Sequence, residues 1–324
     1  MIVCTAEDRP HALVGLKLLA LSLERHCPGV ELHAFSPLFP RAFEQWARTH
    51  RSLKLCATRA GWPSSWNTKP TILLDRLDAG FDDVVWIDAD VVLTRDFRAA
   101  WGALSQDTMV VAGEPASPIG GDGSALRTEA FGFTVGRAFP VAINSAVVRI
   151  TRTHQPLVAA WRELLQEPAY VLAQAQPVAQ RPRHLVSDQD GLAALIGSTR
   201  FANVPVKMLQ PPLDILHAAW GAYANYPLRH RLRHALTGLP PLVHALGQPK
   251  PWDPASAARL SAGLSPYCAV AAAYEEELGE PAPWLHPASA IGRASHAIAL
   301  GNPALRDLPA TLAVAARQWG RRQP

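Results

Sequence analysis

The sequence is poor in lysine and in charge of either sign. It has 324 residues, of which 18% are charged, whereas about a quarter are charged in a typical soluble chain. Five residues are lysine, so 31 − 5 leaves 26 arginines. An arginine bias with much alanine is typical of a GC-rich genome, and we first interpret the low lysine count in this way. The hydrophobic fraction of 48% excludes a disordered chain and predicts a large buried core.

The sequence also predicts no disulfide framework, no signal peptide and no membrane-spanning helix. Its four cysteines form no Cys-x-x-Cys pair and predict no disulfide framework. Residues 1–8 have neither a basic n-region nor an apolar h-region, so we expect no signal peptide. The sequence contains no run of about 18 apolar residues, which is the length needed to span a bilayer. From these three features we expect a reduced, cytoplasmic protein. The net charge is only +4 and no basic stripe carries interleaved aromatics, so we expect no nucleic-acid partner.

Hydrophobic patterning indicates an α/β fold. The chain opens with a buried strand at Ile2–Ala6, a helix up to His26 and a second strand at Val30–Phe35, the start of a parallel sheet covered by helices. We expect Asp8 to cap that first helix. Further strands are predicted at 52–57, 83–87, 109–113, 141–150 and 201–205, with helices at 41–50, 71–77, 155–166 and 187–196 and a long loop at 115–140.

Composition changes near residue 255, where the chain becomes rich in alanine and proline. We therefore predict a catalytic domain over residues 1–255 and a mostly helical C-terminal extension over residues 256–324. A helix is expected to begin at Ser265-Pro266-Tyr267 and to reach Glu277.

Asp88-Ala89-Asp90 follows the strongest strand signal in the sequence. On an extended chain, two residues separated by one other residue point to the same side, and open α/β sheets bind ligands at the carboxyl ends of their strands. Two hard oxygen ligands suit Mn²⁺ or Mg²⁺, with a diphosphate filling the remaining positions. The alternative is a strand-end turn that caps a helix.

A second candidate is the segment from His244 to Trp252, which reads His-x-x-Gly-x-x-Lys-Pro-Trp. Histidine is a good third ligand for a borderline metal. Gly247 allows the backbone to approach a phosphate closely, and Lys250 is a compact charge suited to a leaving diphosphate. Trp252 would pack the loop down. The alternative for His244 alone is a structural histidine.

Three weaker candidates each have an ordinary structural alternative. Lys69, in Trp66-x-x-Lys69-Pro70, would contact phosphate or be a solvated lysine at a helix start. The acids of residues 187–190 would serve a site or only cap a helix. Asn144-Ser145 interrupts an apolar strand, and a buried Asn needs partners, so it would hold a sugar hydroxyl or a neighbouring loop.

Taken in order, these motifs resemble glycosyltransferase family 8 over about residues 1–255. The resemblance implies a GT-A fold, which is a Rossmann-like, mainly parallel sheet with flanking helices. It also implies retaining transfer from a nucleotide-sugar donor, UDP being favoured, with Mn²⁺ as the cofactor and Mg²⁺ as a substitute. Ala146 and Ala245 depart from the family pattern, which has glycine and an aromatic residue there.

The resemblance also assigns roles to residues of this sequence. The metal ligands would be Asp88, Asp90 and His244, and the diphosphate would be held by Gly247 and Lys250. The base and ribose would be lined by Thr5, Ala6 and Asp8, with Lys69 near the phosphates. The transferred sugar would be surrounded by Asn144, Asp188 and Gln189, the last being either a nucleophile or a bystander.

The resulting prediction is a metal-dependent transferase that moves a hexosyl group to a saccharide or lipid-linked acceptor. One alternative is a phosphatase of the haloacid dehalogenase type, because Asp88–Leu93 resembles its first motif. Another is a degenerate nucleotide-sugar-binding module. A short basic amphipathic stretch at 312–322 would lie on the inner face of an anionic membrane, or pack as an ordinary surface helix. The cluster 229–234 would meet an anionic acceptor or form a solvated basic face.

Overall fold

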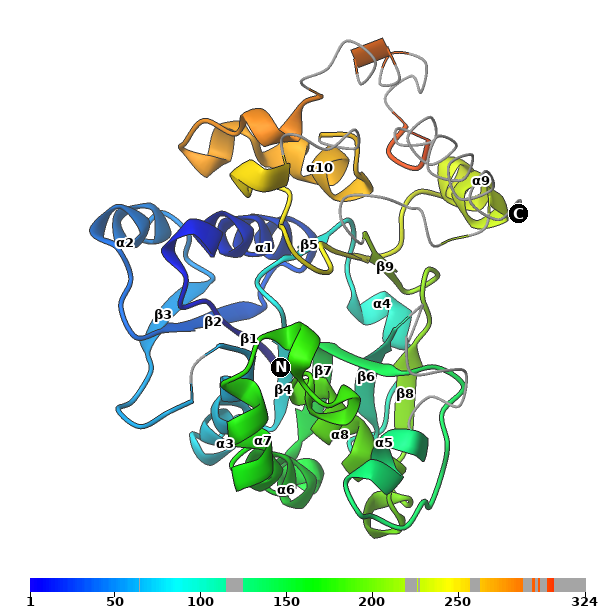
Figure 1. The fold of residues 1–324 in the computed structure, drawn as a ribbon. Coiled ribbons are helices and arrows are strands. Elements are labelled where there is room, and N and C mark those ends of the chain that lie inside the picture. Colours follow the sequence, from blue (N-terminus) through cyan, green and yellow to red (C-terminus); the bar gives the residue numbers. More distant parts are fainter. Residues whose placement is uncertain are drawn as a thin grey trace. The chain divides into compact units, whose positions relative to one another are not determined.

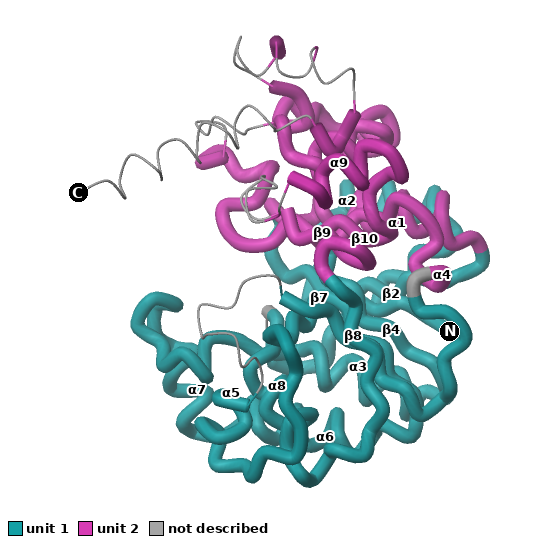
Figure 2. Tube along the Cα trace, turned by 90° about the vertical axis from the view of Figure 1, so that its right-hand side faces the viewer, with its two compact units in different colours: residues 1–10, 29–89, 101–210 teal, residues 11–28, 90–100, 211–324 magenta. Residues whose placement is uncertain are grey.

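The structure, a computed structural model, describes residues 1–63, 65–114, 125–218, 226, 228–256, 263–287, 293–294, 297 and 302–305. The chain divides into two compact units, coloured separately in Figure 2. Unit 1 comprises residues 1–10, 29–89 and 101–210, and unit 2 comprises residues 11–28, 90–100 and 211–324.

Unit 1 is built on a sheet that has seven strands among the described residues, in the order β3-β2-β1-β4-β7-β6-β8. The first four are mutually parallel, β7 is antiparallel to both of its neighbours, and β8 is parallel to β6 (Figure 1). The strands are β1 (Ile2–Ala6), β2 (Glu31–Ser36), β3 (Leu53–Ala57), β4 (Asp83–Ile87), β6 (Met109–Gly113), β7 (Ile143–Thr151) and β8 (Val206–Leu209). The helices are α2 (Arg41–Ala47), α3 (Lys69–Asp78), α5 (Ala125–Ala130), α6 (Gln155–Leu164), α7 (Pro168–Gln174) and α8 (Asp188–Gly197).

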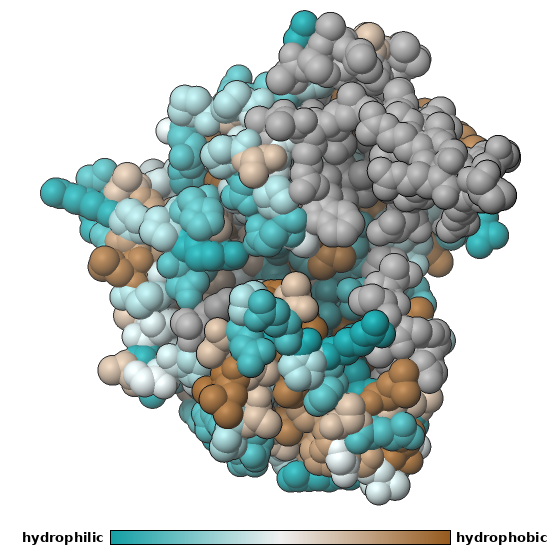
Figure 3. Space-filling view, in the orientation of Figure 1, coloured by the Kyte–Doolittle hydropathy of each residue, from teal (hydrophilic) through white to brown (hydrophobic). Residues whose placement is uncertain are grey.

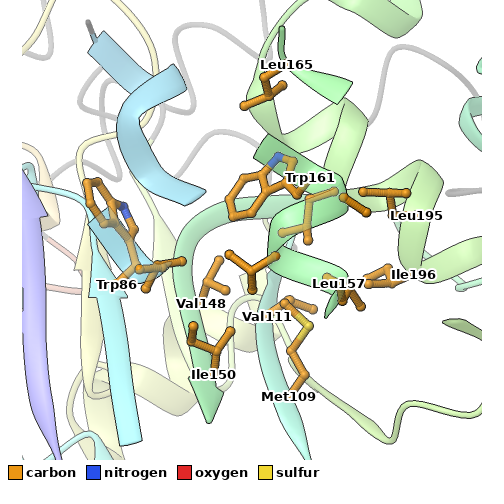
Figure 4. Close-up of a cluster of buried hydrophobic side chains, with 14 of the residues drawn as sticks. Trp86, Met109, Val111, Val148, Ile150, Leu157, Trp161, Leu165, Leu195 and Ile196 are labelled. Carbon is orange, nitrogen blue, oxygen red and sulfur yellow. The ribbon is translucent and has the colours of Figure 1, made fainter. Parts of the chain in front are cut away.

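The main core of unit 1 lies between this sheet and the helices α3, α6 and α8. Helix α6 buries Leu157, Val158 and Trp161 on one side, as expected for an amphipathic helix. Figure 4 shows Leu157 and Trp161 of this helix facing Val111 and Val148 of the sheet. Burying a side chain of leucine size contributes about 1.5–3 kcal/mol, so this layer holds the strand ends and the helix starts in place.

Unit 2 has a smaller sheet in the order β5-β10-β9, formed by β5 (Val91–Leu93), β10 (Leu242–His244) and β9 (Ile215–His217). Its helices are α1 (Leu13–His26), α9 (Leu228–Thr237) and α10 (Pro266–Ala271), and the short α4 (Arg98–Trp101) lies at the unit boundary. Ser22 of α1 accepts a hydrogen bond from the backbone of Leu93 at 3.0 Å. Buried Lys17 pairs with Glu280 at 2.7 Å and thereby ties α1 to the segment after α10.

Most elements predicted from the sequence are confirmed, and three of the strands have the predicted bounds, Ile2–Ala6, 83–87 and 109–113. The strand predicted at 201–205 is wrong. Thr199–Phe201 is a 3₁₀ turn and the strand begins at Val206. Proline has no N–H for a ladder, and Pro205 contributes only its carbonyl, which accepts from Met109 at 2.8 Å.

Two smaller expectations are also wrong. Asp8 does not cap α1, because the N-cap residue is Ala12 and it has no side-chain bond. The predicted loop at 115–140 contains α5, while residues 115–124 lie outside the described residues. The helix expected from Ser265 is confirmed, since the Ser265 hydroxyl accepts from Cys268 N at 3.0 Å and α10 continues in 3₁₀ turns to Leu278.

The predicted domain boundary at residue 255 stays a prediction. The four cysteines are free, as expected. Among the described residues, no helix has both the length and the apolar character needed to cross a membrane.

On the face of unit 1 drawn in Figure 3, apolar side chains are interspersed with hydrophilic ones. Exposed Val171 and Leu172 of α7 belong to this unit.

Candidate functional site

Lys69 is the centre of a buried polar group in unit 1. It is the first residue of α3 and only 3% exposed, so the alternative of a solvated lysine is wrong. Its ammonium lies 2.9 Å from Asp88 Oδ1 and 3.4 Å from Asp188 Oδ2, and it donates to Ser145 Oγ at 2.8 Å. One cation is therefore shared by two carboxylates and a hydroxyl.

The two carboxylates around Lys69 come from different elements. Asp88 follows β4, and its Oδ1 also accepts from Trp86 Nε1 at 2.6 Å. Asp188 begins α8, is buried, and accepts from Ser145 Oγ at 2.7 Å. Burial raises the pKa of Asp188 to about 6, with the Lys69 charge opposing the rise. The Asp188 carboxyl group is therefore more readily protonated than that of an ordinary aspartate.

A chain of amides runs beside this group. Asn144 Nδ2 in β7 donates to Gln189 Oε1 at 3.2 Å, and Gln189 Nε2 donates to Glu114 Oε2 at 3.2 Å. Asn144 Oδ1 in turn accepts from the backbone of Ala146 at 2.9 Å. This sequence of donors fixes the direction of the Gln189 amide, with its carbonyl oxygen toward Asn144 and its nitrogen toward Glu114.

The acids around Gln189 divide between two tasks. Asp190 accepts from Ser187 N at 3.0 Å in a capping box, and it accepts from Arg127 Nε at 2.5 Å. The helix-cap alternative is therefore confirmed for Asp190, whereas Asp188 faces Lys69. Glu114 was missed by the sequence analysis, although an acid directly after the apolar strand 109–113 repeats the pattern of Asp88 after 83–87.

The residues expected to line a nucleoside lie at the end of β1. Thr5 is fully buried, and its Oγ1 has no hydrogen-bond partner among the described residues. Thr68 Oγ1, in the 3₁₀ turn Ser65–Thr68 that packs against β1, is buried and unpartnered in the same way. Ala6 and Asp8 follow Thr5 along the chain. A buried hydroxyl without a partner destabilises the fold by about 1–3 kcal/mol, and a bound polar ligand would remove this penalty.

Unit 2 holds a second polar group, centred on Asp90. Asp90 precedes β5 and His244 ends β10, and these strands are antiparallel neighbours. His244 Nε2 lies 3.3 Å from Asp90 Oδ1, and Lys250 Nζ forms an ion pair with Asp90 Oδ2. Burial alone would raise the pKa of Asp90, but the charges of Lys250 and His244 hold this pKa well below its usual range.

The loop from His244 to Trp252 is held by its own contacts. Lys250 Nζ donates to the carbonyl of Ala245 at 2.7 Å, and its backbone N–H donates to Asp253 at 2.5 Å. Gly247 has a φ of +84°, which side chains other than glycine adopt only with strain. Trp252 packs edge-on against Trp284 with ring centroids 5.8 Å apart, as expected of a residue that fixes the loop.

A second histidine, His217 in β9, contacts His244. Their Nδ1 atoms lie 2.9 Å apart, and the two residues are register partners on parallel strands. His217 was not predicted from the sequence. The repeated pattern of an apolar residue, histidine and alanine, at 216–218 and 243–245, was the available signal.

The structure thus collects the predicted residues into one set per unit. Unit 1 brings together Lys69, Asp88 and Asp188, with Asn144 and Gln189 bonded to each other. Unit 2 brings together Asp90, His244 and Lys250. The segment 312–322 lies outside the described residues.

Comparison with known proteins places the fold. Neither a family model nor a curated protein sequence matches the chain. Among solved structures it is similar to the galactosyltransferase LgtC in complex with donor and acceptor sugar analogues, with 18% identity and a TM-score of 0.54 over 88% of this chain and 99% of that one. It is also similar to the apo glycosyltransferase GlyE of Streptococcus pneumoniae, with 16% identity and a TM-score of 0.53 over 87% of this chain and 60% of that one.

A third similar structure is the bifunctional glycosyltransferase WbbM, with 14% identity and a TM-score of 0.55 over 86% of this chain and 51% of that one. The chain therefore has the GT-A fold of these glycosyltransferases, a mainly parallel sheet flanked by helices, and the predicted fold class is confirmed.

Proposed function

We propose that the chain is a metal-dependent, retaining glycosyltransferase of family 8 type. It would move a hexosyl group from a nucleotide-sugar, UDP-sugar being favoured, to a saccharide or glycoconjugate acceptor. The observation that carries the proposal is the contact of Asp90 with both His244 and Lys250 in unit 2. A carboxylate, an imidazole and an ammonium held together suit a metal ion and a diphosphate.

The donor set fits a divalent cation. Asp88, Asp90 and His244 offer two carboxylate oxygens and one ring nitrogen. Imidazole suits Mn²⁺ better than Mg²⁺, which prefers oxygen ligands and water, so Mn²⁺ is the proposed cofactor and Mg²⁺ a weaker substitute. When bound, the metal would neutralise the negative charge that develops on the departing diphosphate.

The chain's own residues would bind and orient the donor. Lys250 would place its ammonium on the diphosphate, and the backbone at Gly247 would approach the same phosphates. Thr5, Ala6 and Asp8 would contact the base and ribose, a role supported by the unpartnered Thr5 hydroxyl.

The sugar would lie against the polar side chains of unit 1. Lys69 would hold Asp88 and Asp188 in place, and Asn144 would fix the Gln189 carbonyl oxygen in one direction. Asp188 would accept hydrogen bonds from sugar hydroxyls, and Asn144 would donate hydrogen bonds to them. Gln189 would stand next to the anomeric carbon, as nucleophile or as bystander. The acceptor hydroxyl would lose its proton to the departing phosphate, so no separate strong base is required.

A donor panel tests this proposal. The protein is incubated with nucleotide-sugars and Mn²⁺, and released nucleotide is measured with and without saccharide acceptors. Slow release of UDP, lost in His244→Ala, is the expected result. Release of phosphate from a phosphate ester without UDP would instead support the phosphatase, and donor binding without turnover would support a binding module.

The contribution of residues 312–322 to binding of anionic vesicles is tested separately, by comparing the full chain with a variant that lacks residues 309–324.

A further inference from the structure

His217 lies behind the proposed metal ligand His244 and is fixed there on two sides. It is 1% exposed, and the β9–β10 ladder holds its backbone, with Ala218 N donating to the carbonyl of His244 at 2.8 Å. Its own backbone N–H donates to the hydroxyl of buried Tyr226 at 3.2 Å. The backbone of His217 therefore has a defined position, and its burial leaves little room for the ring to move.

The contact between the two rings restricts where their protons lie. The Nδ1 atoms are 2.9 Å apart, so one nitrogen carries the hydrogen and the other accepts it. His244 can ligate a metal through Nε2 only when that atom has a free lone pair. Its proton must then be on Nδ1, which donates to Nδ1 of His217. His217 is the acceptor in this arrangement, with its own proton on Nε2.

We propose that His217 is a positioning residue of the metal site. It accepts the Nδ1–H of His244, selects the tautomer whose Nε2 is free, and holds that nitrogen toward Asp90, from which it lies 3.3 Å. By making the imidazole an effective ligand, His217 also favours Mn²⁺ over Mg²⁺. The inference rests on the proposed function, since it concerns the metal that the transferase would use.

The test uses the full chain and Mn²⁺ alone. Free Mn²⁺ is measured by electron paramagnetic resonance during a titration, which requires neither donor nor turnover. The two informative variants are His217→Asn and His217→Gln. The side-chain oxygen of asparagine occupies the position of Nδ1, whereas glutamine carries its amide one carbon further. His234→Asn, which changes another buried histidine of unit 2, is the matched control, and a thermal melt of each variant reports folding.

We expect His217→Gln to weaken Mn²⁺ binding about 10- to 100-fold, as outer partners of metal-ligating histidines do, and His217→Asn to remain within about threefold of the wild type. Mg²⁺ should compete better in His217→Gln than in the wild type. Equal Mn²⁺ affinity in both variants and the wild type would overturn the role of His217 and leave the metal site standing. Equal losses in Asn and Gln variants would overturn it too, because a structural defect would not distinguish them. A wild type that binds no Mn²⁺ would overturn the metal site itself.

Discussion

The two units arrange their buried charges in opposite ways. In unit 1, one ammonium, that of Lys69, is shared by the carboxylates of Asp88 and Asp188. In unit 2, one carboxylate, that of Asp90, is shared by Lys250 and His244. The first arrangement leaves acceptor oxygens beside amides, which suits sugar hydroxyls, whereas the second suits a cation and a phosphate.

The largest loss of activity is expected when the carboxylate shared by Lys250 and His244 in unit 2 is removed. Asp90→Asn would lose a proposed metal ligand and the partner of Lys250, so Mn²⁺-dependent donor hydrolysis should fall on the order of 10³-fold. The melting temperature should change by less than about 5 °C, because the backbone bond between Asp90 and Ala245 remains. Asp96→Asn, an ion-paired acid of the same unit, is the control and should keep wild-type activity. Full activity of Asp90→Asn would show the ligand assignment to be wrong.

Exchange of the cation tests whether a compact charge is needed. Lys250 contacts both Asp90 and the carbonyl of Ala245 and is nearly buried, so the planar guanidinium of Lys250→Arg would not fit the same place. We expect a loss of about 10²-fold in kcat, measured as nucleotide release, with the fold retained. Arg25→Lys, at an exposed ion pair of α1, serves as control. Wild-type turnover of Lys250→Arg would mean that the scarcity of lysine in this sequence carries no functional information.

The units should also respond oppositely to acid. The pKa of Asp188 in unit 1 is raised by burial to about 6. Below that pH the folded state therefore binds more protons than the unfolded state, and the folded state loses stability as pH rises and Asp188 ionises. The pKa of His234 in unit 2 is lowered by burial to about 4, so its stabilising effect is lost as pH falls from 6.5 to 4. Each effect is worth about 3 kcal/mol.

Thermal melts between pH 4 and 7 measure both effects. Relative to Asp188→Asn, the wild type should gain stability as pH falls from 6 to 4. Relative to His234→Asn, the wild type should lose stability over the same range. Parallel pH profiles for all three proteins would contradict the opposite shifts.

The smallest effect is expected for the residue that orients the Gln189 amide. Glu114→Gln would let that amide turn over, because glutamine both donates and accepts where the carboxylate only accepts. A three- to tenfold fall in kcat with little change in KM for the donor is expected, about 1 kcal/mol. Glu129→Gln, an exposed acid of α5, is the control. A change confined to KM would show that Glu114 binds substrate directly.

The sequence predicted those parts of the fold and of the site whose signals are local. The apolar run at 83–87 and the two acids after it could be read directly, as could the spacing from His244 to Lys250. Contacts between distant segments could not. His217 meets His244 only because β9 and β10 are neighbours in a sheet, and Glu114 meets Gln189 only across β6 and α8.

Errors of strand position have a comparable cause. Phe201–Pro205 has apolar residues of the right kind, but pairing with β6 begins only after Pro205, and the residues before it complete a turn after α8. The three residues of β5 are too few for a periodic pattern, and their pairing with β10 depends on a partner about 150 residues later in the sequence.

The start of α8 has a consequence for engineering. In four successive residues, the outer two, Ser187 and Asp190, close the capping box, and the inner two, Asp188 and Gln189, project toward the polar group of unit 1. A library that varies only the inner pair would explore new sugar selectivities on a helix whose start is already secured. One that varies all four would also remove the cap, which destabilises the fold by about 0.5–2 kcal/mol.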